Sequence, residues 1–197
     1  MTTHANRGMS FEEYITYANR RYRSEGIAVV EKQHTLFKPI RTGQGKLVSC
    51  KVEEKATVDF MGRYRNIPVA IEAKHTSSER IKFSEVKDHQ AEFLDDFTDG
   101  KYGSGFGAVL VSFKLQRFFL VPWIFWSVGR EAWQKSKGKE KGRAMAYGMV
   151  WEAPGKASVS ADELNPAWEI KPNNKYGLPY LSKIDTYTQP STARQVQ

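Results

Sequence analysis

Residues 56–74 read ATVDFMGRYRNIPVAIEAK, and two apolar runs flank a polar turn in this segment. The first run, residues 56–58, resembles a strand that ends at Asp59. The second run, residues 67–74, is predicted to form the next strand, and residues 62–66 are predicted to turn between the two. A hairpin of this kind pairs its two strands side by side. The segment therefore predicts the centre of a β-sheet, with Asp59 beside the second strand.

Two carboxylates and a lysine are expected to meet at this hairpin. Residues two apart in a strand share a face, so Glu72 and Lys74 project to one side while Ala73 points away. Magnesium prefers oxygen ligands and keeps several waters, so Asp59 and Glu72 suit an open metal site on a phosphodiester. Such an ion activates water, and a lysine stabilises the developing charge or positions the water. The spacing by itself also fits an ordinary surface ion pair.

A helix is predicted downstream, beginning at Ser84 as its N-cap. Gln90 falls on its apolar stripe, where an amide needs a partner, either a backbone group or a catalytic water and phosphate. His89 lies off the stripe and is interpreted as solvated or DNA-facing, because no second His or Cys stands at ligand spacing. The apolar residues of the stripe are Val86, Phe93, Leu94 and Phe97.

The N-terminal part is predicted to contain a helix from Ser10 to about Ser24, begun by a Ser10–Glu13 capping box, and a buried strand over residues 27–32. Residues 1–9 are expected to be a flexible arm. A long excursion, residues 36–54, follows and is called the stalk below. A long insertion of this kind is usually functional or disordered, and this one has a hairpin-like composition with glycines at its expected tip, although a solvated loop with surface lysines is the alternative. Leu36 and Phe37 at its base are expected in the core. Its basic residues include Lys38, Arg41, Lys46 and Lys51.

The second half is predicted to complete the sheet with strands over 105–113 and 116–121, and Pro122 is expected to start a helix with an aromatic face. We expect those aromatics in the core or a dimer interface rather than stacked on bases. Residues 135–143 are rich in Gly and Lys and either contact DNA or form a linker. Residues 151–185 are expected to pack back on the domain, which spans 10–185, and residues 186–197 to be disordered.

Taken together, six short motifs resemble those of RecU-type Holliday junction resolvases in order and spacing, over about residues 6 to 185. The resemblance implies a mixed α/β, restriction-endonuclease-like sheet flanked by helices, with a projecting hairpin, in the PD-(D/E)XK nuclease superfamily. It also implies a homodimer that uses Mg²⁺, with Mn²⁺ as a substitute, to make paired incisions in four-way branched DNA. The motifs are residues 6–12, 26–30, 57–60, 71–74, 89–90 and 177–181.

The same resemblance assigns roles to individual residues. Asp59 and Glu72 would bind metal, Lys74 would serve the attacking water, and Gln90 would orient water or phosphate. Glu12 resembles, with a looser fit, an acidic residue of the first helix that completes some sites of this superfamily. The stalk would enter the junction centre. Contacts with DNA are expected from Arg7, Lys38, Arg41, Lys46, Lys51 and His89.

Composition agrees with a polyanionic partner. The 197 residues include 30 Lys and Arg against 22 Asp and Glu, a net charge of +8. The single cysteine, Cys50, excludes an intramolecular disulfide. We expect a cytoplasmic protein with no membrane contact, because the sequence has neither a secretory signal nor an apolar run near 18 residues. Recombinase or branch-migration proteins are candidate partners. Two alternatives stay open: a restriction-like or repair endonuclease that cuts linear duplex, and a noncatalytic junction-binding recombination factor.

Overall fold

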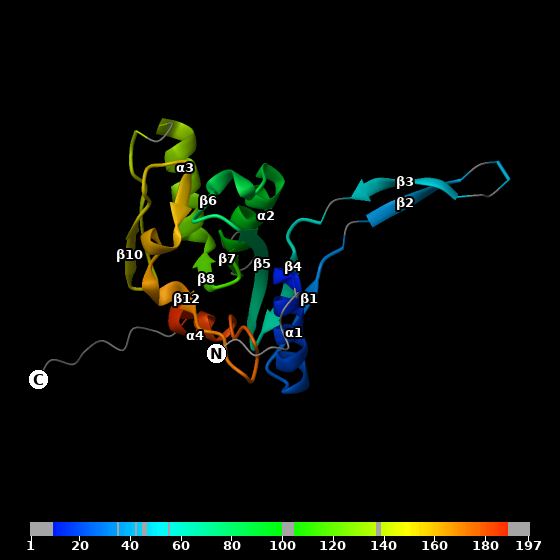
Figure 1. The fold of residues 1–197 in the computed structure, drawn as a ribbon, viewed down its shortest axis with the longest axis horizontal. Coiled ribbons are helices and arrows are strands. Elements are labelled where there is room, and N and C mark those ends of the chain that lie inside the picture. The colour runs from blue at the N-terminus through cyan, green and yellow to red at the C-terminus, as the bar shows by residue number, and fades with distance from the viewer. Residues whose placement is uncertain are drawn as a thin grey trace, which may run out of the picture.

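A mixed α/β body carries one long projecting hairpin in the computed structural model of the chain (Figure 1). The body is built on a sheet in which β5 and β7 run parallel and the other neighbours run antiparallel. The structure describes residues 10–34, 36–41, 43–44, 47–54, 56–99, 105–136 and 139–188. The sheet has the spatial order β1 (Ala28–Lys32), β4 (Phe60–Tyr64), β5 (Ile67–Thr76), β7 (Phe106–Phe113), β8 (Arg117–Pro122), β12 (Glu169–Ile170).

The remaining elements cover the sheet or extend from it. The helices are α1 (Phe11–Ser24), α2 (Asp88–Thr98), α3 (Trp123–Ser136) and α4 (Ser182–Thr188), with short 3-10 turns η2 (Phe83–Glu85), η3 (Ala161–Glu163) and η4 (Pro166–Trp168). Three two-stranded ladders complete the fold: β2 (Leu36–Arg41) with β3 (Leu47–Glu54), β6 (Arg80–Lys82) with β11 (Ser158–Ser160), and β9 (Arg143–Ala146) with β10 (Met149–Glu152). This is the predicted fold class, and it is compatible with a restriction-endonuclease-like fold.

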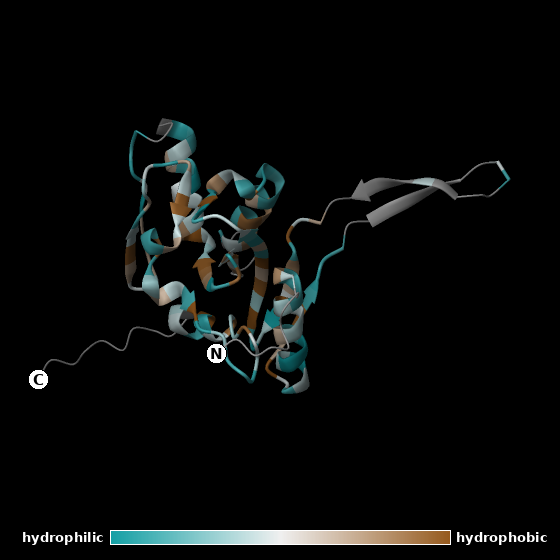
Figure 2. Cartoon of the chain, in the orientation of Figure 1, coloured by the Kyte–Doolittle hydropathy of each residue, from teal (hydrophilic) through white to brown (hydrophobic). Residues whose placement is uncertain are grey.

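Strand β5 shows how helices come to cover both faces of the sheet. Its side chains alternate between faces. His75 lies against Phe11 of α1, with ring centroids 6.4 Å apart, whereas Glu72 accepts a hydrogen bond from Gln90 of α2. Helix α1 therefore packs on one face and α2 on the other. Strand β7 is buried along its whole length, as expected for a strand between two covered faces, and apolar residues gather in the strands of the body (Figure 2).

The first strand of the central hairpin begins four residues later than predicted, whereas the second begins at Ile67 as predicted. Strand β4 begins at Phe60, so Asp59 precedes this strand and does not end one, and the turn is confined to Arg65 and Asn66, not 62–66. Tight two-residue hairpin turns need positive φ, and Arg65 adopts a φ of 51°. Pairing Phe60 with Ile71 buries both side chains completely, and this burial favours the observed register.

The start of the second helix also differs from the prediction. Helix α2 begins at Asp88, while Ser84 lies inside the turn η2, so Ser84 is not the N-cap. The backbone N–H of Lys87 is capped by the side chain of Gln90. The helix after Pro122 begins at Trp123, because Pro122 is the last residue of β8 and pairs with Ala108. Proline tolerates both a strand end and a first helical turn, so the pattern did not separate them.

Other predictions of the fold are confirmed. Helix α1 has the expected Ser10–Glu13 capping box, and the aromatic residues Phe125 and Trp126 of α3 are fully buried core. The C-terminal segment packs back through Trp168 and Tyr180, which are also fully buried. Helix α4 runs to Thr188, beyond the expected domain limit at 185. Residues 1–9 and 189–197 lie outside the described residues.

The stalk is a β-hairpin that points away from the body (Figure 1). Strands β2 and β3 pair antiparallel, with register shifts between Leu36 and Phe37 and between Ile40 and Arg41. The hairpin leaves the sheet at the end of β1 and returns just before β4, so its base stands beside Asp59. In the described part of the chain, no helix has the length and apolar character needed to cross a membrane.

Candidate active site

Asp59 is held at the junction between the stalk and the sheet. Its side-chain Oδ2 accepts a hydrogen bond from the backbone N–H of Ala73 at 2.8 Å. Its backbone carbonyl accepts another from the N–H of Gln33 at 2.7 Å. The first bond ties Asp59 to β5 and the second ties it to the end of β1. The carboxylate is therefore fixed beside the strand that carries Glu72 and Lys74, as the sequence predicted.

Glu72 is a fully buried carboxyl group with one bonded and one free oxygen. Oε1 accepts a hydrogen bond from Gln90 Nε2 at 2.8 Å and lies 2.5 Å from Lys74 Nζ. Oε2 is buried and has no hydrogen-bond partner among the described residues. A buried acceptor without a partner is costly in a folded protein, and such groups often bind an ion or a water or belong to a functional site. The free oxygen therefore marks this carboxyl group as a candidate ligand.

Burial raises the pKa of Glu72 to about 7 from its ordinary value of 4.5. The nearby charge of Asp59 raises the pKa further, whereas the Lys74 ammonium lowers it. Desolvation and a like charge both disfavour the ionised carboxylate. Two carboxyl groups in such proximity are stabilised by a cation, and a carboxyl group perturbed by burial and a neighbouring charge is typical of functional sites.

Gln90 connects the second helix to Glu72. Its Oε1 accepts a hydrogen bond from the backbone N–H of Lys87 at 3.0 Å, and its Nε2 donates to Glu72. One amide therefore caps α2 and orients the buried carboxyl group at the same time. The sequence left two partners open for this amide, a backbone group or a catalytic water and phosphate. The structure supplies the backbone group and adds Glu72.

The residues at this site fit a divalent metal ion with oxygen ligands. Glu72 Oε2 is free, and Asp59 uses Oδ2 for the bond from Ala73, so both carboxyl groups keep an oxygen for a cation. No group of three or more His, Cys, Asp or Glu side chains able to hold a metal is found among the described residues. A site of two carboxylates leaves the other positions to water and substrate oxygens, which suits magnesium.

Glu12 is not brought to the two carboxylates as a free side chain. Its Oε2 lies 2.5 Å from Nζ of Lys32, at the end of β1. The hydrogen bond to Glu12 raises the pKa of Lys32, and the charge of Asp59 acts in the same direction. Lys32 thus pairs with Glu12 and lies near enough to Asp59 to feel its charge, a contact that the sequence analysis did not predict. Side chains alternate along β1, so Lys32 lies on the same face as Val30, toward α1. This alternation is the feature of the sequence that could have predicted the contact between Lys32 and Glu12.

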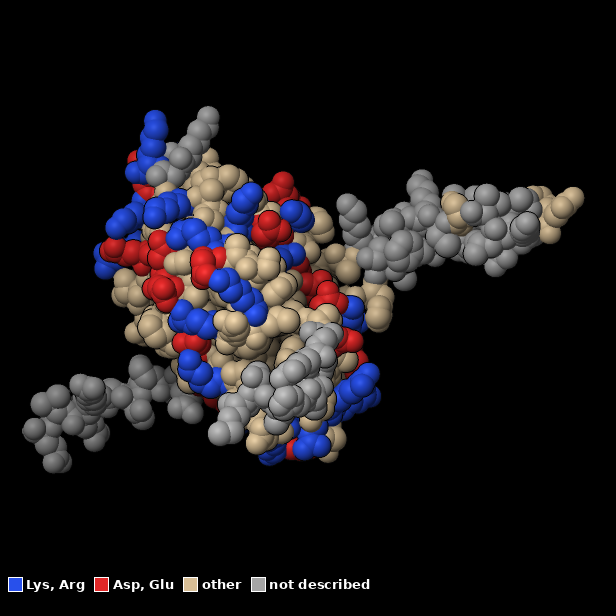
Figure 3. Space-filling model, viewed as in Figure 1, with Lys and Arg blue, Asp and Glu red and all other residues tan. Residues whose placement is uncertain are grey.

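The residues predicted to contact DNA are spread over the surface. His89 is exposed in the first turn of α2, beside a pocket that Arg130 and Trp133 also line. Lys38 stands opposite Lys51 in the stalk register, and Arg41 opposite Leu47; of these residues only the backbone is described. Arg7 and Lys46 lie outside the described residues. On the face drawn in Figure 3, basic and acidic side chains are interspersed over the body.

Comparison with known proteins identifies the family. The family model described as Recombination protein U (RecU) matches residues 6–186. A protein of Lactobacillus delbrueckii subsp. bulgaricus, named Holliday junction resolvase RecU, is 28% identical over 189 residues, covering 92% of this chain and 80% of its own length. Proteins of the same name from Streptococcus pneumoniae and Streptococcus mutans serotype c are 31% and 32% identical over 125 residues, covering 60% of this chain and 62% of theirs. The chain therefore belongs to the RecU family.

Proposed function

We propose that this protein is a Holliday junction resolvase, an endonuclease that makes paired symmetric incisions in four-way DNA junctions during recombination and repair. The observation that carries this proposal is the meeting of Asp59, Glu72, Lys74 and Gln90 at the base of a projecting hairpin. The RecU relatives bear the name of this activity. Within this family, a site of two carboxylates and a lysine is best understood as a phosphodiester-cutting centre.

Asp59 and Glu72 would hold Mg²⁺, with Mn²⁺ as a substitute. The free oxygen of Glu72 and the second oxygen of Asp59 are the proposed ligands. When bound, the ion supplies an activated water and offsets charge on the phosphate. It would also let Glu72 ionise in its buried position, because an adjacent cation lowers the pKa of a carboxyl group.

The protein side chains then position the reaction. The Lys74 ammonium lies at Glu72 Oε1, where it can donate to the attacking water or to a phosphate oxygen. Gln90 keeps the Glu72 carboxyl group oriented from α2. In-line attack on phosphorus would break the bond to O3′ and leave 5′-phosphate and 3′-hydroxyl ends. Only the roles of Asp59, Glu72 and Lys74 require contact with the reacting groups.

Substrate shape would be recognised by the stalk. A hairpin that projects from the body beside Asp59 can enter the open centre of a four-way junction and meet the phosphates of more than one arm. Lys38, Arg41, Lys46 and Lys51 are the proposed phosphate contacts there, with Arg7 and His89 on the body. Phosphate contacts set position without reading bases, so we expect weak sequence specificity and strong salt dependence. A homodimer would place two sites on a substrate of near two-fold symmetry.

The decisive experiment compares Mg²⁺-dependent cleavage of an immobile four-way junction and a linear duplex of matched sequence. Wild type is run beside Asp59→Asn, which keeps the shape of the side chain and removes its charge. Asp96→Asn, an exposed residue of α2, is the matched control. We expect paired symmetric nicks on the junction from wild type and Asp96→Asn, and none from Asp59→Asn, which still binds.

Each other outcome points to a different function. Equal cutting of junction and duplex by wild type would favour a restriction-like or repair endonuclease. Tight junction binding without cleavage by wild type would favour a noncatalytic recombination factor. Full activity of Asp59→Asn would refute the assignment of the catalytic site. Light scattering of the purified protein tests the proposed homodimer separately.

A further inference from the structure

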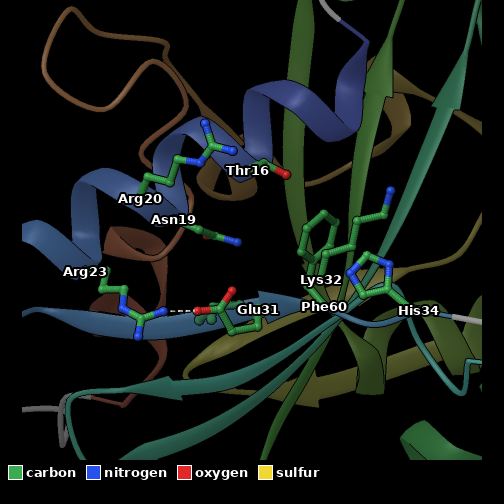
Figure 4. A pocket seen from close by; sticks show the side chains of 9 residues that line it. Thr16, Asn19, Arg20, Arg23, Glu31, Lys32, His34 and Phe60 are labelled. Carbon is green, nitrogen blue, oxygen red and sulfur yellow. Dashed lines mark hydrogen bonds and ion pairs between the residues drawn. The ribbon is translucent and has the colours of Figure 1, made fainter.

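A pocket of about 380 Å³ lies between α1 and β1, where the chain enters the stalk (Figure 4). Thr16 and Asn19 face it from α1, and Lys32, Phe60 and His34 bound its opposite side. The active-site residues Glu72, Lys74 and Gln90 do not line it. The pocket is therefore separate from the catalytic centre, and nothing in the catalytic proposal uses it.

Asn19 gives this pocket a fixed polar wall. The residue is only 7% exposed, and its Oδ1 accepts a hydrogen bond from the Tyr180 hydroxyl at 2.6 Å. That bond leaves the amide nitrogen directed at the pocket (Figure 4). Among the described residues no acceptor for Asn19 Nδ2 is found, and this nitrogen is not one of the fully buried polar atoms that lack a partner, so it is open to the pocket. An amide donor held in this way can bond a ligand or a water in the pocket.

Arg20 gives the pocket an unpaired positive charge. Its side chain is exposed at the rim of the pocket and forms no ion pair or hydrogen bond with any residue that the structure describes. The other two cations are engaged: Arg23 pairs with Glu31, and Lys32 pairs with Glu12. One free guanidinium with neutral donors beside it suits a ligand of one negative charge. A backbone phosphodiester has that charge, and arginine binds phosphate through paired N–H groups.

The position of the pocket connects it to the cut strand. Phe60 lines the pocket and follows Asp59 directly in the chain. Lys32 stands opposite Phe60 in the β-ladder, and the next residue, Gln33, donates its N–H to the Asp59 carbonyl. Phe60 and Lys32 lie on the α1 face of the sheet, whereas Glu72 and Lys74 lie on the α2 face, and the two faces meet where the chain passes Asp59 into β4. A strand held with its scissile phosphate at Asp59 would run past this end of β1 and β4, and one of its neighbouring phosphates would reach the pocket.

We propose that the pocket between α1 and β1 binds a backbone phosphate of the cleaved DNA strand that flanks the scissile one, with Arg20 and the Asn19 amide as donors. This inference rests on the proposed function, since it takes the DNA strand to pass Asp59. Lys32 also lines the pocket, but its charge is paired with Glu12, so Arg20 is the cation proposed to bind the phosphate. The pocket is a positioning site that holds the strand in register with the reacting atoms.

Equilibrium binding to a four-way junction in EDTA, where no cleavage is expected, tests the proposal with wild type, Arg20→Ala and Arg21→Ala. Arg21 is the matched control, because it is the next residue of α1, is exposed, and bonds the Lys175 carbonyl away from the pocket. Alanine favours the helix at both positions. We expect Arg20→Ala to raise Kd about tenfold and to reduce the slope of log K against log salt by about 0.9, the value for one lost phosphate contact. Arg21→Ala should change neither.

A second measurement locates the phosphate. Junctions carrying one uncharged methylphosphonate at successive positions around the expected incision are bound by wild type and by Arg20→Ala. One position should weaken wild type about tenfold and leave Arg20→Ala nearly unchanged, because the charge pair is already absent. Equal losses at every position, or equal behaviour of the two arginine variants, would overturn the proposal. Cleavage of the unmodified junction in Mg²⁺ is scored separately, so failure of the nuclease assignment is distinguished from failure of the pocket.

Discussion

Replacing Glu72 with glutamine should make the metal-free protein more stable at high pH, and the effect should grow as pH rises. Glu72 is fully buried, and its pKa is about 7 in the folded protein against 4.5 for the ordinary group. Glutamine keeps the shape and removes the charge. The prediction concerns the free energy of unfolding in EDTA, so it is independent of any catalytic role.

The sign follows from proton binding. Between pH 4.5 and about 7 the folded protein holds the Glu72 proton more tightly than the unfolded chain does. The free energy of unfolding therefore falls as pH rises through this window and levels off above it. At about 1.4 kcal/mol for each pKa unit, ionised Glu72 costs the folded state about 3 kcal/mol at high pH. Between about pH 5 and pH 8, the advantage of Glu72→Gln over wild type should widen by about 2.5 kcal/mol.

Urea unfolding in EDTA at several pH values between these limits measures the difference directly. Glu92→Gln, an exposed residue of α2, controls for the change of one formal charge. Added Mg²⁺ at high pH should then stabilise wild type and leave Glu72→Gln unaffected, because a ligand that binds only the folded state raises stability by mass action. A difference between Glu72→Gln and wild type that stays flat with pH would refute the reasoning from burial and charge.

Three further predictions concern positioning, the stalk and the sheet. Gln90→Ala removes both hydrogen bonds of the bridging amide. It should lower the free energy of unfolding by about 1–3 kcal/mol, measured by urea unfolding. It should also lower the single-turnover rate of junction cleavage about 10- to 100-fold. Replacing residues 36–54 with a tight turn should abolish the preference for junction over duplex in competition binding while the protein stays soluble, because the hairpin pairs within itself. Gly62→Ala should destabilise the sheet by about 3 kcal/mol, since the added Cβ would lie 2.0 Å from the Val29 carbonyl oxygen. Gly43→Ala is the control, because a Cβ at that position meets no atom within 4 Å.

Each of these predictions has a result that would contradict it. Unchanged cleavage by Gln90→Ala would show that Glu72 needs no orienting partner. Retained discrimination by the shortened protein would move junction recognition to the body. Equal urea midpoints for the two glycine variants would mean that β1 can shift away from β4 at little cost.

Local patterns in the sequence were sufficient for the parts of this protein that depend on near neighbours. The period of two along β5 placed Glu72 and Lys74 on one face, and the hairpin brought Asp59 beside them. The Ser10–Glu13 capping box began α1 where predicted. These features involve residues within one turn, one strand or one hairpin. Short-range stereochemistry decides them, so the sequence predicts them well.

Only the tertiary structure decided how the site is completed. Gln90 reaches Glu72 because α2 docks on the face of β5 that carries this side chain, and Glu12 meets Lys32 because α1 docks on the other face. The burial of Glu72 Oε2, and with it the raised pKa, requires both the sheet and α2 in place. The pocket beside Asp59 forms between a helix and a strand that share no local pattern. Such contacts depend on docking across the sheet, which side-chain periodicity in a single strand or helix does not specify.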